Sequence, residues 1–247
     1  MTYKKIISIS QPRYLPALNY IQRMVHSDIF ILLESVQRQA RAWENRNKLL
    51  IPDEKWLTIP IKSSSRSLIS NTFTDGQKWL ENHKKIIKQH YAKCKFYDED
   101  ILNEYYKNMN SNKDNNLSFQ EIAFSSINSL SKILDISINP IRENDINNDK
   151  SLTGGEKILN ICECLQGSTY ISGPNGANYK IHDFFKNSGI AVKYHFYKPT
   201  KYTHLNQEKF FPLLGFFDPL FNMGHKWTRK EIFKKPHFSN EPSNFKL

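Results

Sequence analysis

The residues from Trp43 to Asn47 carry side chains that could bind an anionic or a planar ligand. The planar guanidinium of Arg46 can clamp a phosphate or a carboxylate through two parallel hydrogen bonds. The flanking Asn45 and Asn47 can each donate or accept a hydrogen bond, and the indole of Trp43 can stack on a ring. We therefore predict that all four residues bind substrate, with a solvated basic loop as the alternative interpretation.

A second set of polar groups follows the first apolar run of the chain, residues 6–10. Pro12 and Pro16 restrict the residue before each of them to extended conformations, so the connecting loop is stiff. This loop would present Gln11 and Tyr14 at the carboxyl end of a first strand, where ligands bind in α/β sheets. We predict that both residues bind substrate, and a structural turn with a buried Tyr14 is the alternative.

A β-α-β unit would position these groups. Residues 18–25 have apolar side chains at helical spacing, and residues 29–33 form an apolar run of strand length. A right-handed crossover between parallel strands brings their carboxyl ends to the same edge of the sheet. Gln37, which follows the second strand, would then lie near Gln11, and we predict that it also binds substrate.

A glycine-containing loop follows another predicted strand, residues 169–172. Glycine permits a ligand to approach the backbone closely, and loops at strand ends commonly carry function. We predict that Ser172, Gly173 and Tyr179 line the substrate site from this side. A simple turn is the alternative interpretation.

His83 is the residue that we predict to be catalytic. It lies in the helical pattern of residues 77–110, and imidazole is the side chain most easily poised to transfer protons near neutral pH. His90 lies seven residues further along, near the same helix face. No carboxylate or third ligand stands at a recognised zinc spacing, so we predict no metal site.

Strands and helices alternate along the chain, which indicates an α/β fold. The hydrophobic pattern predicts further strands at 56–61, 135–138, 169–172 and 190–196, the last of the sheet, and helices at 77–110, 118–134 and 156–165. Residues 141–150 resemble a polar linker, and Asp218 is expected to cap a helix. We predict a Rossmann-like, mostly parallel sheet with flanking helices and a helical insertion at about 77–134. Residues 1–227 would form a single domain, and residues 228–247 a loosely ordered basic C-terminal tail.

The composition narrows the classes of protein. The chain has 247 residues, of which 39% are hydrophobic and 13% aromatic, as in a folded domain. No apolar run reaches the ~18 residues of a membrane span, and the first run is too short for a secretory signal, so we expect a cytoplasmic protein. The net charge of +11 suits a phosphorylated substrate. No nucleic-acid-binding motif accompanies the charge, so no nucleic-acid partner is expected.

Taken together, these motifs resemble the WbqC-like protein family. The resemblance covers residues 5 to 224 and is carried by Gln11-Pro12-x-Tyr14-Leu15-Pro16 with Tyr20, Val36-Gln37, Trp43-x-Asn45-Arg46-Asn47, Leu57-Thr58-Ile59-Pro60, His83, Tyr170-Ile171-Ser172-Gly173 with Gly176 and Tyr179, and Leu220-Phe221-Asn222-x-Gly224. Several ordered motifs make this resemblance more specific than any one of them alone.

The resemblance implies a role in making bacterial surface polysaccharide, such as the O-antigen of lipopolysaccharide. The reaction that we expect is transfer of an acyl or aminoacyl group to a nucleotide-linked amino sugar. The donor would be coenzyme A or a carrier-protein thioester, so an acyl carrier protein is an expected partner and no tightly bound cofactor is needed. His83 would act as the base, and Gln11, Asn45 and Arg46 would bind substrate or stabilise the oxyanion.

Two positions depart from the family pattern. Two acidic residues commonly precede the Val-Gln pair, where this chain has Glu34-Ser35, and a glutamine near position 202 is replaced by Thr203 and His204. Both departures put substrate specificity in doubt. Two alternative functions stay open: a non-catalytic sugar-nucleotide-binding or scaffold protein, and a degenerate nucleotidyltransferase-like enzyme whose opening loop lacks the His-x-Gly-His motif.

Overall fold

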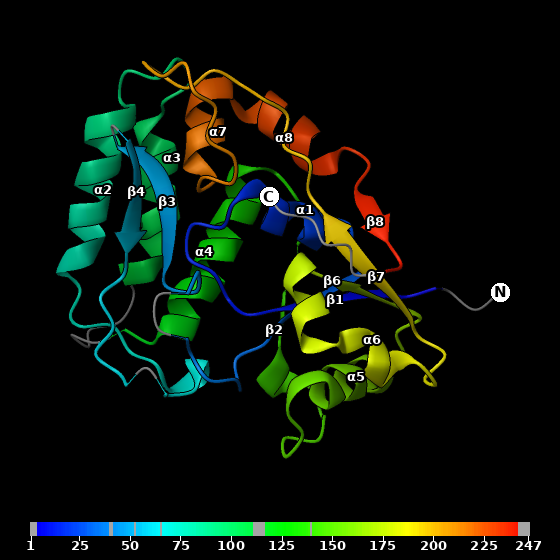
Figure 1. Ribbon diagram of the computed structural model, residues 1–247. Helices are drawn as coiled ribbons and strands as arrows, with labels where there is room; N and C mark the ends of the chain where they lie inside the picture. Colours follow the sequence, from blue (N-terminus) through cyan, green and yellow to red (C-terminus); the bar gives the residue numbers. More distant parts are fainter. Residues whose placement is uncertain are drawn as a thin grey trace.

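Six strands form the central sheet of the computed structural model, which describes residues 4–39, 42–51, 53–64, 66–110, 117–138 and 140–241. In spatial order they are β5 (Ile141–Arg142), β2 (Ile29–Leu32), β1 (Ile6–Ser10), β6 (Thr169–Ser172), β7 (Ala191–Phe196) and β8 (His237–Ser239). The first five are parallel, and β8 pairs with β7 in the antiparallel direction. The expected mostly parallel α/β sheet is therefore confirmed (Figure 1).

Helices cover both faces of this sheet. α1 (Leu18–Val25) packs on one face, while α5 (Gly154–Cys164) and α6 (Ile181–Phe185) pack together on the other. The alternation of side chains along β2 separates the two layers: Ile31 joins the core under α5, and Leu32 joins the core under α1. Neighbouring residues of one strand thus support two hydrophobic cores.

The order of connections creates a topological switch point between β1 and β6. α1 carries the chain from β1 to β2, whereas β6 lies on the other side of β1 and is reached through α5. The loops after β1 and β6 therefore lead to opposite sides of the sheet. Ligands of open α/β sheets bind in the crevice outside the carboxyl ends of strands at such a point.

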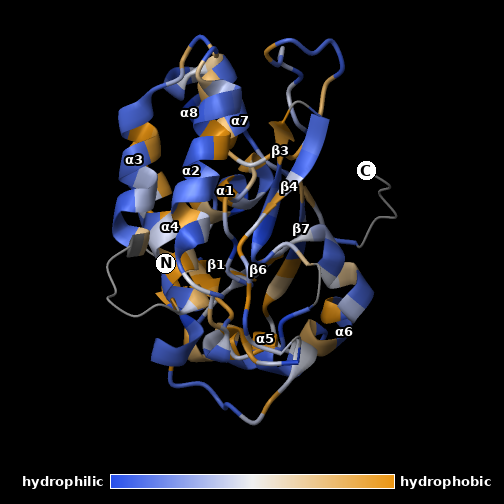
Figure 2. Ribbon diagram, turned by 90° about the vertical axis from the view of Figure 1, so that its left-hand side faces the viewer, coloured by the Kyte–Doolittle hydropathy of each residue, from blue (hydrophilic) through white to orange (hydrophobic). Residues whose placement is uncertain are grey.

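A helical layer and a separate β-hairpin lie beside the sheet, on the left in Figure 1. The helices are α2 (Lys78–Tyr91), α3 (Glu99–Lys107) and α4 (Phe119–Ile133), so the helical insertion is confirmed. The hairpin pairs β3 (Arg46–Ile51) with β4 (Asp53–Thr58). Figure 2 shows hydrophilic residues over much of the outward surface of α2 and α3, as expected of helices with one buried face.

The structure differs from the sequence prediction within this region. Arg46 and Asn47, expected in a ligand-binding loop, instead begin β3, because Leu49 and its apolar successors are buried. Residues 135–138 form no strand: Ile136 and Ile138 pack in the helical core instead of pairing with the sheet. The edge strand is β5, which lies where a polar linker was expected.

The prediction that the C-terminal tail is loosely ordered is wrong for residues 228–241, and residues 242–247 lie outside the described residues. α8 (His225–Phe233) packs against α1, with Thr228 and Ile232 fully buried. After it, β8 extends the sheet beyond β7, so β7 is not the last strand; Phe238 lies opposite His195. This segment is rich in lysine, and its few apolar residues form a buried face only because α1 packs against them. The assignment of residues 1–227 to one domain stays a prediction.

None of the helices in the described ranges has both the length and the apolar character that crossing a bilayer requires.

Candidate functional site

Two arginines and a tyrosine meet at the switch point. Arg13 belongs to the loop after β1, and Arg23 projects from α1. The Cζ atoms of the two arginines lie 5.4 Å and 5.6 Å from the ring centroid of Tyr20. The Tyr20 hydroxyl donates to the Gln11 carbonyl oxygen over 3.0 Å, which fixes the ring against the β1 loop. One aromatic ring therefore holds both guanidinium groups by cation–π contacts.

Arg23 links β1 to β6. Its side chain is buried, with the residue 7% exposed, and Nη2 donates to Ser10 Oγ over 2.7 Å. A Cβ atom at Gly173 would lie only 2.3 Å from Nη1, so the loop after β6 passes directly over the guanidinium. A side chain at position 173 would therefore displace the guanidinium from this place. Gly173 was predicted to let a ligand approach the backbone, and in the structure the group that approaches it is the Arg23 guanidinium.

The buried carboxyl group of Glu44 attracts the Arg13 guanidinium electrostatically. Within the described ranges, no carboxylate forms an ion pair with Arg13 or Arg23, and the buried Nε of Arg23 has no hydrogen-bond partner. Burial and the neighbouring Arg23 lower the pKa of Arg13 to about 10, and burial lowers the pKa of Arg23. Two like charges in a desolvated site are costly without an anion. The site is thus suited to a phosphate or a carboxylate.

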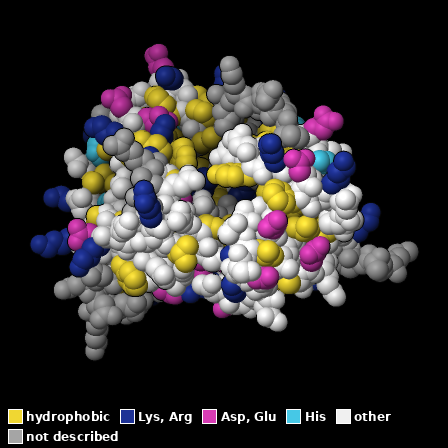
Figure 3. Space-filling model, turned by 60° about the horizontal axis from the view of Figure 1, so that its bottom comes forward, with side chains coloured by type: hydrophobic (Ala, Val, Ile, Leu, Met, Phe, Trp, Pro, Cys, Tyr) yellow, Lys and Arg dark blue, Asp and Glu magenta, His cyan; other side chains and the backbone are white. Residues whose placement is uncertain are grey.

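Aromatic and cationic side chains continue from this pair towards the hairpin. Arg13 Cζ lies 6.0 Å from the Trp43 ring centroid, and the rings of Trp43 and Trp56 meet edge to face at 4.7 Å. Arg46 Cζ lies 4.0 Å above the Trp56 ring, which is 38% exposed as a residue. We call this row the cation–aromatic strip; its members are Arg23, Tyr20, Arg13, Trp43, Trp56 and Arg46. Figure 3 shows a hollow in the middle of the lower face of the molecule, with Lys or Arg atoms inside it.

The structure brings only some of the predicted site residues into the strip. Trp43 and Arg46 belong to it, and Gln11 adjoins it through Tyr20. Asn45 and Asn47 are buried and donate to the backbone carbonyls of Ile59 and Leu15, so they fasten the hairpin to its neighbours.

Tyr14 and His83 lie together in the core. The Tyr14 hydroxyl is 2.8 Å from His83 Nδ1 and also contacts the Tyr106 hydroxyl. His83 is 4% exposed, packs against Trp79 and has a hydrogen bond to the Thr58 backbone. Burial lowers the pKa of His83 to about 4. The imidazole is therefore neutral near pH 7, and both ring nitrogens are engaged.

The remaining predicted residues lie apart from one another. Ser172 is buried and donates to the Gly173 carbonyl oxygen. Gln37 is exposed and forms an isolated bridge with Leu68. Tyr179 is 60% exposed at the end of the 3₁₀ segment that follows β6. These positions border the carboxyl edge of the sheet without converging on one point.

Sequence reasoning missed Arg23 and Trp56. Arg23 sits among buried apolar residues of α1, three positions after Tyr20, and a charged residue in such a helix is usually taken as solvent-exposed. The signal that could have found it is this position on the apolar face. Trp56 was read only as part of a strand, although its partner Trp43 was singled out.

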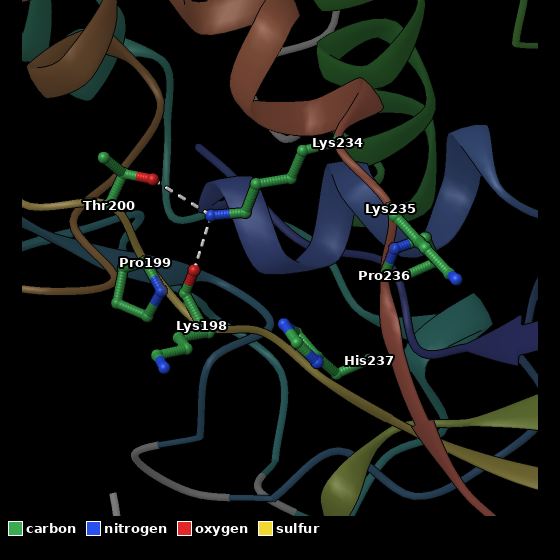
Figure 4. A pocket seen from close by; sticks show the side chains of 7 residues that line it. All are labelled: Lys198, Pro199, Thr200, Lys234, Lys235, Pro236 and His237. Carbon is green, nitrogen blue, oxygen red and sulfur yellow. Dashed lines mark hydrogen bonds between the residues drawn. The ribbon is translucent and has the colours of Figure 1, made fainter.

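A separate concave area lies between residues 198–200 and 234–237 (Figure 4). Lys234 Nζ donates to the Lys198 carbonyl oxygen over 2.6 Å and to Thr200 Oγ1 over 3.1 Å. It also pairs with Glu231. The side chains of Lys198 and Lys235 point in different directions in Figure 4. The charges do not converge, and we assign no ligand to this area.

Asp218 is the centre of a buried polar cluster rather than a simple helix cap. It lies in α7 (Phe217–Met223) and accepts hydrogen bonds from the Tyr91 hydroxyl over 2.8 Å and the Tyr202 hydroxyl over 2.7 Å. His204 is one of the positions that depart from the family pattern. Its Nδ1 atom lies 2.8 Å from Asp218 Oδ1, and its Nε2 atom accepts a hydrogen bond from the Phe211 amide. Every member has a partner, so this cluster fastens residues 202–211 to α7.

We expect Asp218→Asn to destabilise the fold by about 2–4 kcal/mol, because Tyr91, Tyr202 and His204 lose a carboxylate acceptor. Urea unfolding of the purified protein measures this loss. The matched control is Asp183→Asn, which removes the same charge from the exposed surface of α6 and should change the unfolding free energy by less than about 0.5 kcal/mol. Equal effects of the two substitutions would contradict a structural role of the cluster.

The sheet and the strip define an α/β protein with an anion-receptive site at a topological switch point. The chain belongs to the WbqC-like protein family, whose model matches residues 11–230. An uncharacterized protein of Mycobacterium tuberculosis (strain ATCC 25618 / H37Rv), Rv1507c, is 26% identical over 225 residues, which cover 89% of this chain and 94% of that protein. No solved structure matches the chain.

Proposed function

We propose that this protein transfers an acyl or aminoacyl group to a nucleotide-linked amino sugar during synthesis of bacterial surface polysaccharide such as O-antigen. The observation that carries the proposal is the pair Arg13 and Arg23, two neighbouring cations at the switch point that form no ion pair with a carboxylate of the described residues. A phosphate group supplies the negative charge that this pair lacks.

Different members of the cation–aromatic strip bind different parts of such a substrate. Arg13, which is partly exposed, binds a phosphate, and Arg23 supports it from beneath. Trp43 and Trp56 offer apolar ring surface to a base or a sugar, and Arg46 borders the far end. Gln11 lies at the β1 loop, within reach of the same crevice. The buried Tyr14, Asn45 and Asn47 act through the scaffold that holds the strip in place.

The acyl donor is a thioester of coenzyme A or of an acyl carrier protein, and no tightly bound cofactor takes part. The reaction takes place in the cytoplasm, where both kinds of thioester are made. His83 supports the Tyr14 loop in this proposal, because both of its ring nitrogens are engaged and its pKa lies far below neutrality. A proton acceptor must therefore come from another residue at the carboxyl edge.

The decisive experiment incubates the pure protein with amino-sugar nucleotides and a set of acyl and aminoacyl thioesters, followed by mass spectrometry. A mass gain on the sugar nucleotide is the expected result. Absence of any gain with every donor contradicts the transferase.

We expect Arg13→Met to weaken binding of a nucleoside diphosphate sugar by about 10- to 100-fold, since it removes a charge-assisted hydrogen bond worth about 1.5–3 kcal/mol. Isothermal titration calorimetry measures the affinity. Lys186→Met, which removes the same charge at the exposed end of α6, is the control and should leave the affinity within about twofold. Unchanged affinity of the Arg13 variant would remove the guanidinium pair from the site.

Non-catalytic binding of a sugar nucleotide is the second candidate function. It is favoured by the burial of Tyr14 and His83, which leaves the strip rich in binding groups and without an exposed histidine. Under this reading Arg13→Met weakens binding as above, and no donor produces a mass gain. The nucleotidyltransferase-like alternative has only the architecture of the sheet in its favour.

A further inference from the structure

Glu44 is a buried carboxyl group beside the cation–aromatic strip. The residue is 2% exposed, and neither carboxylate oxygen has a hydrogen-bond partner within the described residues. Trp43 precedes it in the chain and Arg46 follows two residues later, so members of the strip lie on both sides of it in the sequence. A buried carboxyl without a hydrogen bond is costly, and its place beside a site for anions needs a reason.

Backbone and ring contacts hold Glu44 against the loop after β1. Its carbonyl oxygen accepts a hydrogen bond from the Tyr14 amide over 2.9 Å, and Tyr14 follows Arg13 directly in the chain. The residue before it, Trp43, contacts the same arginine, with 6.0 Å between the Trp43 ring centroid and Arg13 Cζ. Two neighbouring contacts thus keep the segment that carries the carboxyl beside Arg13.

The charges that act on Glu44 come from two arginines. Arg13 in the β1 loop and Arg38 in the segment after β2 both attract the carboxylate. Burial, the largest cause, raises the pKa of the Glu44 carboxyl, whereas nearby backbone amides and the two arginines oppose this shift in part. Within the described residues, neither arginine forms an ion pair with a carboxylate. Glu44 therefore reduces the positive potential at Arg13 while the Arg13 guanidinium keeps no direct carboxylate contact.

We propose that Glu44 makes the strip select its ligand by charge. It favours the diphosphate diester of a sugar nucleotide over a nucleotide that ends in a free phosphate. This inference rests on the proposed function and deepens it. A phosphate within a diester carries one negative charge, whereas a terminal phosphate has a second pKa of about 6 and carries nearly two at neutral pH. The repulsion from a fixed carboxylate grows with the charge of the ligand.

Burial of Glu44 is compatible with this role, because the carboxylate acts on the ligand without touching it. A charge in a weakly solvated site acts over several ångströms, since little water screens it. The proposed reaction leaves the diphosphate unchanged, so acceptor and product carry the same charge on this group. Free nucleoside diphosphates and triphosphates carry more charge, and Glu44 disfavours them as competitors for Arg13 and Arg23.

The test compares two ligands that differ in the charge of the diphosphate. UDP-N-acetylglucosamine and UDP are titrated calorimetrically at pH 8, which favours the ionised carboxylate, into the wild type, Glu44→Gln and the control Glu156→Gln. The control removes the same charge from the exposed first turn of α5. We expect the wild type and the control to bind the sugar nucleotide more tightly than UDP. In Glu44→Gln the ratio of the two affinities should shift by about tenfold in favour of UDP.

Glu44→Asp separates charge from packing. It keeps the carboxylate and shortens the side chain, so its ratio of affinities should stay close to that of the wild type. A ratio in Glu44→Asp that matches Glu44→Gln would assign the effect to packing and overturn the proposal. Because each ratio compares two ligands on one preparation, a partly unfolded variant does not distort it.

The remaining outcomes distinguish this inference from the proposed function. The same ratio in the wild type and Glu44→Gln overturns the role of Glu44 alone, as does a wild type that prefers UDP. Lack of a mass gain with every thioester contradicts the transferase alone, because the ratio is measured without a donor. Failure of both nucleotides to bind overturns both proposals.

Discussion

Arg23→Met is expected to make the protein more stable and, at the same time, a poorer binder. The substitution removes a buried cation that has no described acidic partner and that lies beside Arg13. Replacing an uncompensated buried charge with an apolar side chain of similar length is worth ~2 kcal/mol in favour of the folded state. The loss of positive charge should weaken binding of a nucleoside diphosphate sugar by about 10- to 100-fold.

Urea unfolding and calorimetric titration of the same preparation measure the two effects. Lys186→Met again serves as the control, since it lowers the net charge equally without touching the strip. A less stable Arg23→Met variant would mean that the guanidinium serves the scaffold through Ser10 and the Gly173 loop. Opposite signs for stability and affinity are the mark of a residue kept for a ligand.

The second large effect concerns the contribution of Glu34 to the pH dependence of stability. Its pKa is raised from 4.5 to about 7 in the folded protein, mainly by burial. The folded state therefore binds a proton more tightly than the unfolded chain. This stabilising contribution is complete below pH 4.5 and is lost as the pH rises through 7.

Glu34→Gln removes this titration. We expect the variant to be about 2 kcal/mol more stable than the wild type at pH 8 and nearly equal to it, apart from pH-independent differences, at pH 4.5. Chemical unfolding at the two pH values measures the difference, with Glu156→Gln as the control. If the wild type and Glu34→Gln show the same change in stability between these pH values, the carboxyl does not titrate as its burial indicates.

The opening unit was the most predictable part of the fold. The helix over residues 18–25 has the bounds expected from its apolar spacing, and the strands on either side are short, dense apolar runs. Local periodicity predicts such elements well because each has a buried face of its own. The family resemblance, carried by ordered motifs rather than by periodicity, is likewise confirmed.

The errors in the sequence prediction have a common physical cause. The elements and side-chain positions that were predicted wrongly depend on partners that are far away in the sequence. β3 exists because residues 53–58 pair with it, and β8 exists because β7 leaves an edge open. Tyr14 and Asn47 have the polar groups of a binding residue, yet each is held by a distant element, α2 or the β1 loop. A sequence pattern gives the chemical group and not the direction in which it points.

The contact between Gly173 and Arg23 couples two positions that are 150 residues apart in the chain. A Cβ atom at position 173 would lie 2.3 Å from Arg23 Nη1, so a side chain there requires the guanidinium to move or residue 23 to become shorter. The two positions are therefore expected to vary together. A redesign of the crevice for a different anion must therefore change Gly173, in the loop after β6, and Arg23 of α1 together.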